Sequence, residues 1–167
     1  DCDFLNTGTL SIAAGATFTG GLNTTLCSGT NIAGNIVTAA NDMDLAATTL
    51  TADATLRSTT GAINVTTITD GAGSYTLSLG EADNQTGTIT FSGNVTVNTL
   101  ETFSSDYDIA FEGIANVIDI NTIFANTGGL TFGNDSDDTI TFNGGLSADA
   151  GGTITLFGKL YSSNDAI

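Results

Sequence analysis

The chain lacks histidine, proline and tryptophan, and lysine and arginine together number only 2 among its 167 residues. A nucleophilic site of the Ser-His-Asp or Cys-His kind needs a histidine to accept the proton, so both kinds are excluded. A polysaccharide lyase usually takes its proton with arginine or lysine, and Arg57 and Lys159 stand far apart in the sequence. We therefore expect no enzyme activity.

The few basic residues are outnumbered by 18 acidic ones, which gives a formal net charge of -16. Such a charge opposes binding to nucleic acid and to an anionic membrane surface, and we expect neither as a partner. The chain has no apolar run of about 18 residues, so membrane insertion is not expected either. The scarcity of Lys and Arg, together with many threonines, favours an extracellular or cell-surface β protein over a cytosolic enzyme.

In place of these residues the chain has a strand pattern, which is clearest in residues 129–157. Apolar side chains alternate there with threonines, so that each short run has one apolar face and one hydroxyl-bearing face. The pattern predicts that Ile140, Phe142, Ile154 and Leu156 point inward. Glycine, asparagine, aspartate and serine fill the segments between the runs, and these residues turn the chain.

Equivalent strands recur at intervals of about 20 to 23 residues. Examples are the steps from Val95 to Val117, from Val117 to Ile140 and from Gly129 to Gly152. Regular coils of this length predict an all-β fold, a parallel β-solenoid of about seven or eight coils that is roughly 36 Å long at about 4.8 Å per coil.

The length indicates one solenoid domain over residues 1–167. A longer repeat is superposed on the coils, with an offset of about 120 to 124 residues, and it predicts that residues 1–45 resemble residues 121–167. The matching segments are FLNTG (4–8) with FANTG (124–128), and TFTGGL (17–22) with TFNGGL (141–146). Residues 32–47 are the least regular stretch, and we expect a single helical turn or a bulge there.

Cys2 and Cys27 are separated by about one coil plus a small insertion. Stacked coils place equivalent Cα atoms about 4.8 Å apart, which a disulfide accepts. The spacing therefore predicts a bridge between neighbouring coils. Two free buried thiols and a bond to another subunit are the alternatives.

The best candidate for a metal site is the turn at residues 133–139, where Asn134, Asp135, Asp137 and Asp138 offer oxygen ligands of the kind that calcium prefers. The alternative is a solvated acidic turn. No other cofactor is expected. Two further carboxylate pairs could flank a glycosidic bond, but they lie in turns without the apolar pocket that raises the pKa of a general acid; these pairs are Asp42 with Asp44 and Asp106 with Asp108.

Two longer stretches, TGGLTFGNDSDDTITFNGGL at 127–146 and TGAINVTTITDGAGSYTLSLG at 60–80, resemble the units of long bacterial surface proteins. Those proteins are built from tandem β-strand repeats, in the style of the filamentous-haemagglutinin adhesins. The resemblance implies a right-handed parallel β-helix that is exported and works as an adhesin, stalk or fibre. It implies no catalytic residues.

Both ends of the sequence are strand-like and show no polar cap or helix. An end built like the interior of a tandem array accepts another subunit as it would accept the next coil. We therefore expect an extracellular structural protein that assembles with itself, head to tail, into a filament. The alternative is a β-helical segment of a long adhesin that binds a glycan or a neighbouring cell.

Overall fold

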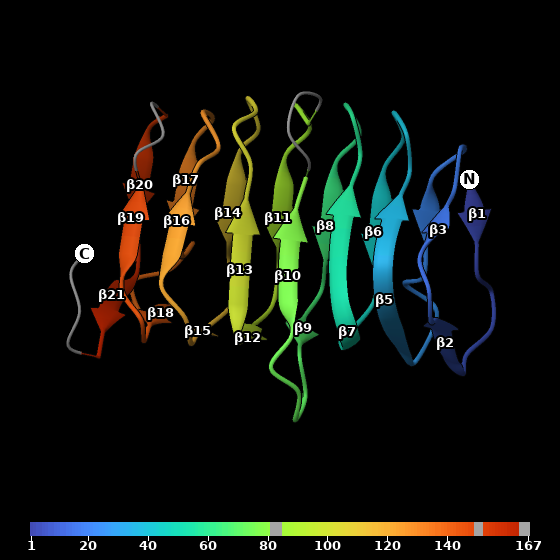
Figure 1. Ribbon diagram of the computed structural model, residues 1–167, viewed down its shortest axis with the longest axis horizontal. Helices are drawn as coiled ribbons and strands as arrows, with labels where there is room; N and C mark the ends of the chain where they lie inside the picture. Colours follow the sequence, from blue (N-terminus) through green and yellow to red (C-terminus); the bar gives the residue numbers. More distant parts are fainter. Residues whose placement is uncertain (81–84, 149–151, 164–167) are drawn as a thin grey trace.

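The computed structural model describes residues 1–80, 85–148 and 152–163, and within these ranges it contains strands and turns and no helix. The strands wind into a parallel β-solenoid of about seven turns with about 21 residues per turn. The first and last strands lie at opposite ends of the stack (Figure 1). The predicted fold class is therefore confirmed.

Each coil passes through three faces in the same order. The first face is an 8-stranded parallel sheet within the described residues. Its strands in spatial order are β1 (Cys2–Asp3), β4 (Leu22–Asn23), β6 (Met43–Leu45), β8 (Ile63–Val65), β11 (Ile89–Phe91), β14 (Ile109–Phe111), β17 (Leu130–Phe132) and β20 (Ile154–Leu156).

The second and third faces share two long strands that bend from one face to the other, β5 (Gly29–Val37) and β7 (Thr48–Arg57). The second face also contains β2 (Thr9–Ile12), β9 (Ile68–Thr69), β12 (Val95–Val97), β15 (Ala115–Ile118), β18 (Thr139–Phe142) and β21 (Lys159–Ser162). The third face contains β3 (Ala16–Thr17), β10 (Thr76–Leu79), β13 (Thr99–Thr102), β16 (Thr122–Phe124) and β19 (Leu146–Ala148).

Residues 32–47 form strands and a turn, and the predicted helical turn is absent from them. The last part of β5 and all of β6 lie in this stretch, and the register of β5 against β7 shifts between Ile32 and Gly34. The extra residues at this shift lie in β7, between Leu50 and Ala54, so the bulge expected within residues 32–47 is not found there either. Ala39, in the turn after β5, has a positive φ of 52°.

The strand register differs by one residue from the register that the sequence spacing predicted at β15. Thr96 pairs with Val117, and Asn116 pairs with Ile140. The inward position in this coil therefore belongs to Asn116, which is 1% exposed, and Val117 points outward. Apolarity alone favoured Val117 for the interior, and the structure places a polar side chain there instead.

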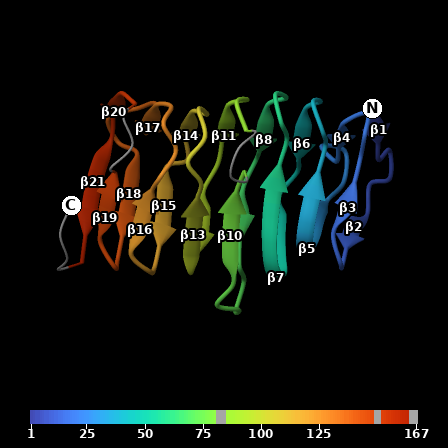
Figure 2. The ribbon, with the colours of Figure 1, turned by 45° about the horizontal axis from the view of Figure 1, so that its top comes forward.

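The strands of successive coils lie side by side along the stack (Figure 2), and their inward side chains form the columns of the core. Phe91, Phe111 and Phe132 stack in one column, with ring centroids 5.4 and 5.8 Å apart. Phe124 and Phe142 meet this column edge-on, at 5.8 and 6.0 Å from Phe132. Aromatic pairs in these geometries gain energy beyond that of burial, so the ring contacts add to the stability of this part of the core.

The turns between faces stack as closely as the strands do. A Cβ at Gly87 would collide with the backbone of Gly61 in the previous coil, and a Cβ at Gly152 would collide with Gly128. Glycine at these two positions is therefore required by the coil spacing and not by a positive φ.

Four residues were expected to point inward in the last coils, and two of them are covered. Ile140 and Phe142 are buried, whereas Ile154 and Leu156 are each 51% exposed. Ile154 and Leu156 nevertheless keep the inward register that was expected of them. Both lie in register with the inward residues Leu130 and Phe132 on the neighbouring strand, but no described coil lies beyond them.

None of the described residues form a helix of the length and apolarity that crossing a membrane requires.

Tyr107 lies inside the corner between the third and first faces. Its hydroxyl donates to the carbonyl of Leu79 at 2.8 Å and accepts from the N–H of Phe103 at 2.9 Å. Burial raises the pKa of Tyr107 to about 12, because the phenolate would lose its hydration, and the Phe103 N–H opposes this effect only in part.

Alkaline pH is expected to weaken the fold through Tyr107. An unfolded tyrosine ionises near pH 10, below the folded pKa of about 12. The stabilisation from the neutral phenol is therefore fully present below about pH 10 and is lost as the pH rises through about 12. The free energy of unfolding of the unmodified protein and of Tyr107→Phe, measured from about pH 8 to 12, should converge over that window. A difference that stays constant across it would show that Tyr107 ionises as freely in the folded chain as in the unfolded one.

Candidate functional site

The C-terminal end of the solenoid exposes the cross-section of the core. Ile154 and Leu156 of β20 are half exposed, as are Phe157 and Tyr161 beside them. A hollow of about 350 Å³ opens between the last strands; its lining consists of Phe132, Leu146, Ser147, Ala148, Ile154 and Leu160. An apolar surface of this kind at the end of a sheet marks an interaction site.

The N-terminal end exposes the same columns at the other end of the stack. Cys2 of β1 is exposed, Phe4 and Leu10 are only partly buried, and Leu5 is 73% exposed. Phe4 packs edge-on against Phe18, with ring centroids 6.2 Å apart. The sequence predicted two open ends but not these particular residues. The signal that identifies them is the alternation within each strand, followed in register along the stack.

The edge strands at both ends have backbone groups with no described strand beside them. On the first face, the N–H of each inward residue that opens a strand donates to a carbonyl of the following coil, as in Ile109 to Gly129 and Leu130 to Thr153, both at 2.9 Å. The corresponding N–H in the last coil belongs to Ile154. The row of hydrogen bonds therefore stops at β20 because the described stack stops there.

Few charged residues lie near the two ends of this strongly acidic chain. Residues 152–163 contain one charged residue, Lys159, and residues 1–41 contain two, Asp1 and Asp3. Lys159 Nζ lies 3.3 Å from the carboxylate of Asp137. Contact between the ends would bring together surfaces with few charges, so the overall charge of -16 opposes it less than it would oppose contact elsewhere on the acidic surface.

The predicted calcium turn is held together by its own side chains. Asp138 is 5% exposed, and its Oδ2 accepts from the N–H groups of Asn134 and Asp135 at 2.8 and 2.9 Å. Asp135 Oδ1 accepts from the N–H of Asp137 at 3.1 Å. Across the described part of the chain, no three side chains of His, Cys, Asp or Glu are grouped so that they could hold a metal ion. Calcium binding at Asn134, Asp135, Asp137 and Asp138 stays a prediction.

The two cysteines lie near the N-terminal end and are free thiols in the structure. Cys2 in β1 stands opposite Leu22, whereas the buried Cys27 lies in the turn after β4. The Sγ atom of Cys27 faces the Asn6 side-chain oxygen at 3.5 Å. The structure thus lacks the bridge that the spacing predicted, because the register places Leu22 where the bridge needs a cysteine. Mass spectrometry without reductant tests the pairing.

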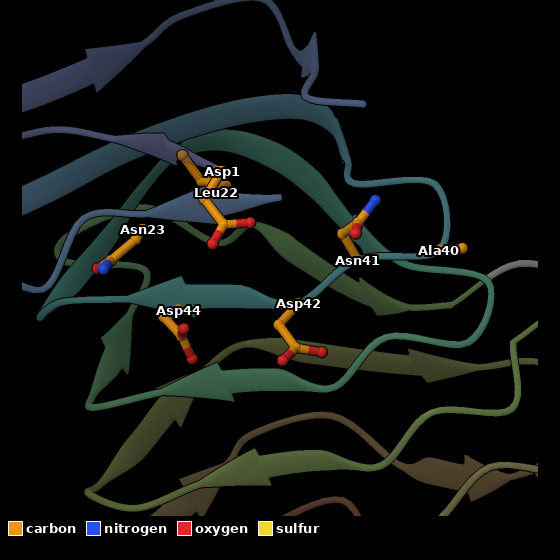
Figure 3. A pocket seen from close by; sticks show the side chains of 7 residues that line it. All are labelled: Asp1, Leu22, Asn23, Ala40, Asn41, Asp42 and Asp44. Atoms are coloured by element: carbon orange, nitrogen blue, oxygen red, sulfur yellow. The ribbon is translucent and has the colours of Figure 1, made fainter. Parts of the chain in front are cut away.

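The carboxylate pair Asp42 and Asp44 lines a hollow of about 200 Å³ on the first face, together with Asp1 and Asn23 (Figure 3). Asp42 accepts from the N–H of Ala62, and Asp44 accepts from the side-chain amide of Asn64, both at 2.8 Å. These bonds link successive coils, so both aspartates help to hold the stack together.

In the pair Asp106 and Asp108, Asp108 also links successive coils. Asp108 Oδ1 accepts from the N–H of Gly129 in the next coil at 2.6 Å, and Asp106 is exposed. Neither residue lies in an apolar pocket of the kind that a general acid needs.

The segments that match at an offset of about 120 to 124 residues lie on different faces of the solenoid. Phe4 follows the first-face strand β1, whereas Phe124 ends the third-face strand β16. Thr17 ends the third-face strand β3, and Thr141 lies in the second-face strand β18. The matched segments thus share a local strand-turn pattern without sharing a position in the coil. Residues 164–167, part of the predicted overlap, lie outside the described residues.

A third hollow, of about 410 Å³, lies on the outer side of the third face. Glu101 and Asn121 lie there beside Phe103 and the 53% exposed Ile123. The Ser78 hydroxyl donates to Glu101 at 3.0 Å. Polar and apolar groups thus face solvent together at this place.

The chain matches no protein-family model, no curated protein and no solved structure.

Proposed function

We propose that this solenoid is an extracellular structural protein, the subunit of a filament that assembles head to tail. The observation that carries the proposal is that the inward columns of the core are uncovered at both ends of the stack. Open sheet edges and apolar ends pair readily with another chain, and a solenoid usually covers them with a capping element. The described residues contain no such element.

The ends differ from each other, so the contact between two copies is heterologous. A heterologous contact that does not close a ring adds copies without limit and produces a fibre. The axis of the solenoid supplies the direction of growth, since the uncovered strands lie at its two ends (Figure 1).

Negative-stain microscopy of the purified 167-residue chain tests this proposal. We expect unbranched fibres whose subunits rise by roughly 38 Å, which is eight strand spacings of about 4.8 Å. A stable monomer in sedimentation at high concentration, with no fibres, would reject the filament.

Replacing Leu156 by lysine is expected to abolish these fibres. Leu156 is 51% exposed, so the single chain should tolerate the charge, but a second copy would have to bury it. Thr155→Lys is the matched control, because Thr155 points outward on the same strand and should leave fibres intact. Circular dichroism of both variants checks that the fold persists. Equal fibre formation by the two variants would contradict the role of this end.

The second candidate function is an adhesive segment of a longer surface protein. The hollow around Glu101, Asn121 and Phe103 favours it, because an aromatic face beside a carboxylate and an amide suits a sugar ring. Glycan binding that Phe103→Ala removes from a chain that stays monomeric would support this function over the filament.

A further inference from the structure

The same columns of inward side chains are uncovered at both ends of the stack, and their alignment specifies how two copies join. The inference rests on the proposed filament and adds its register. On the first face, successive strands align one inward column of Cys2, Leu22, Met43, Ile63, Ile89, Ile109, Leu130 and Ile154. The column begins with the exposed Cys2 and ends with the half-exposed Ile154.

The second face repeats this arrangement. Its strands align Leu10, Thr30, Thr48, Ile68, Val95, Asn116, Ile140 and Leu160. Both end members, Leu10 and Leu160, are apolar and only partly buried. The first-face column and the second-face column therefore each begin and end with an apolar residue that is not fully buried.

We infer that the next copy continues both columns, with its β1 paired to β20 and its β2 paired to β21. Ile154 then lies opposite Cys2 of the next copy, and Leu160 lies opposite Leu10 of the next copy. In this register Phe4 of the next copy, which packs edge-on against Phe18 of its own chain, stands opposite Leu156.

The hydrogen bonds continue in the same register. Within the chain, Leu130 N–H donates to the carbonyl of Thr153, the residue before Ile154. If this pattern continues across the contact between two copies, the N–H of Ile154 donates to the carbonyl of Asp1 in the next copy. On the second face, Lys159 N–H donates to the carbonyl of Asp138, and the same step gives Thr9 of the next copy a bond to Gly158. A shift of one residue would turn every inward side chain outward, so the register is strongly specified.

The contact between copies places Cys2 of the next copy opposite Ile154, so a cysteine introduced at position 154 can report the register. Paired residues on neighbouring strands have Cα atoms about 4.8 Å apart, within the range of a disulfide. Ile154→Cys in the assembled protein, treated with diamide to accept the two electrons and two protons, should give a ladder of covalent oligomers. Peptide mapping should locate the bond between residue 2 of one copy and residue 154 of another.

Two controls isolate the register. Ile154→Cys combined with Cys2→Ser should give no ladder, which shows that the buried Cys27 takes no part. Thr155→Cys places the thiol on the outer side of the same strand, opposite Asp3 of the next copy, and should lose most or all of the ladder. Ile154 is half exposed in the single chain, so neither variant at this strand should unfold it.

The outcomes separate this inference from the filament itself. Fibres in the microscope, with a ladder from Thr155→Cys and none from Ile154→Cys, would overturn the register while leaving the filament in place. Monomers without fibres or ladder in every variant would overturn both the register and the filament.

The unmodified protein gives a further readout, since assembly in this register should cause a loss of Cys2 alkylation by iodoacetamide. Unchanged alkylation in fibres would contradict burial of Cys2 at the joint.

Discussion

Replacing Phe111 by alanine is expected to lower the free energy of unfolding by about 3 to 5 kcal/mol. Phe111 is 0% exposed and stacks between Phe91 and Phe132, with ring centroids 5.4 and 5.8 Å away. It also meets the edge of Phe124 at 6.2 Å. The substitution removes the burial of one ring, leaves a cavity and breaks three ring contacts at once.

Chemical denaturation followed by circular dichroism measures this effect. Phe157→Ala is the matched control, since the same atoms are removed from a ring that is 58% exposed at the C-terminal end. We expect this control to change the free energy of unfolding by less than about 1 kcal/mol. A loss at Phe111 no larger than the loss at Phe157 would show that the aromatic column is not a principal source of stability.

The strands of the solenoid were predictable because their physical signal is local. A strand with one buried face alternates apolar and polar residues, and Ile140 and Phe142 satisfy that rule with Thr139 and Thr141 between them. The coil length was predictable for a related reason, since stacked strands repeat the same pattern after each circuit. Neither inference required knowledge of distant contacts.

The open ends and the inward register of their strands could be predicted from the sequence, but the exposure of individual side chains there could not. Alternation tells which side of a strand faces the axis, and it placed Ile154 and Leu156 correctly in the columns of Leu130 and Phe132. Whether another coil covers those residues depends on what lies beyond the strand. Local pattern has no information on that point, so it does not give the exposed fraction of Ile154 and Leu156.

The cysteines show a second limit. Their separation matches a coil closely enough to suggest neighbouring positions, but a register error of a few residues moves a side chain around the corner of the coil. In the structure Leu22 faces Cys2, and Cys27 lies beyond the end of β4. Spacing alone predicts which coils are neighbours and leaves the facing residue undetermined.

Asn116 is the clearest example of a residue that sequence reasoning missed. Its side chain points into the core and joins three coils. Its Oδ1 accepts from the N–H of Val95 at 2.9 Å, and its Nδ2 contacts the carbonyls of Gly113 at 2.8 Å and Thr139 at 3.3 Å. An asparagine between the apolar Val95 and Ile140 was the available signal, but the apolar neighbour Val117 fitted the inward pattern better.

Asn116→Ala is expected to lower the free energy of unfolding by about 3 kcal/mol or more, because it leaves the buried N–H of Val95 and the carbonyl of Gly113 without their partner. Asn94→Ala is the matched control, since Asn94 Oδ1 accepts from the N–H of Ala115 at 3.0 Å at an exposed position where water replaces the lost bond. We expect this control to cost less than about 1 kcal/mol. Equilibrium denaturation of the two variants compares the same side chain and the same kind of bond in two environments. Equal losses would show that burial adds nothing to the bond at Asn116, and would point back to an inward Val117.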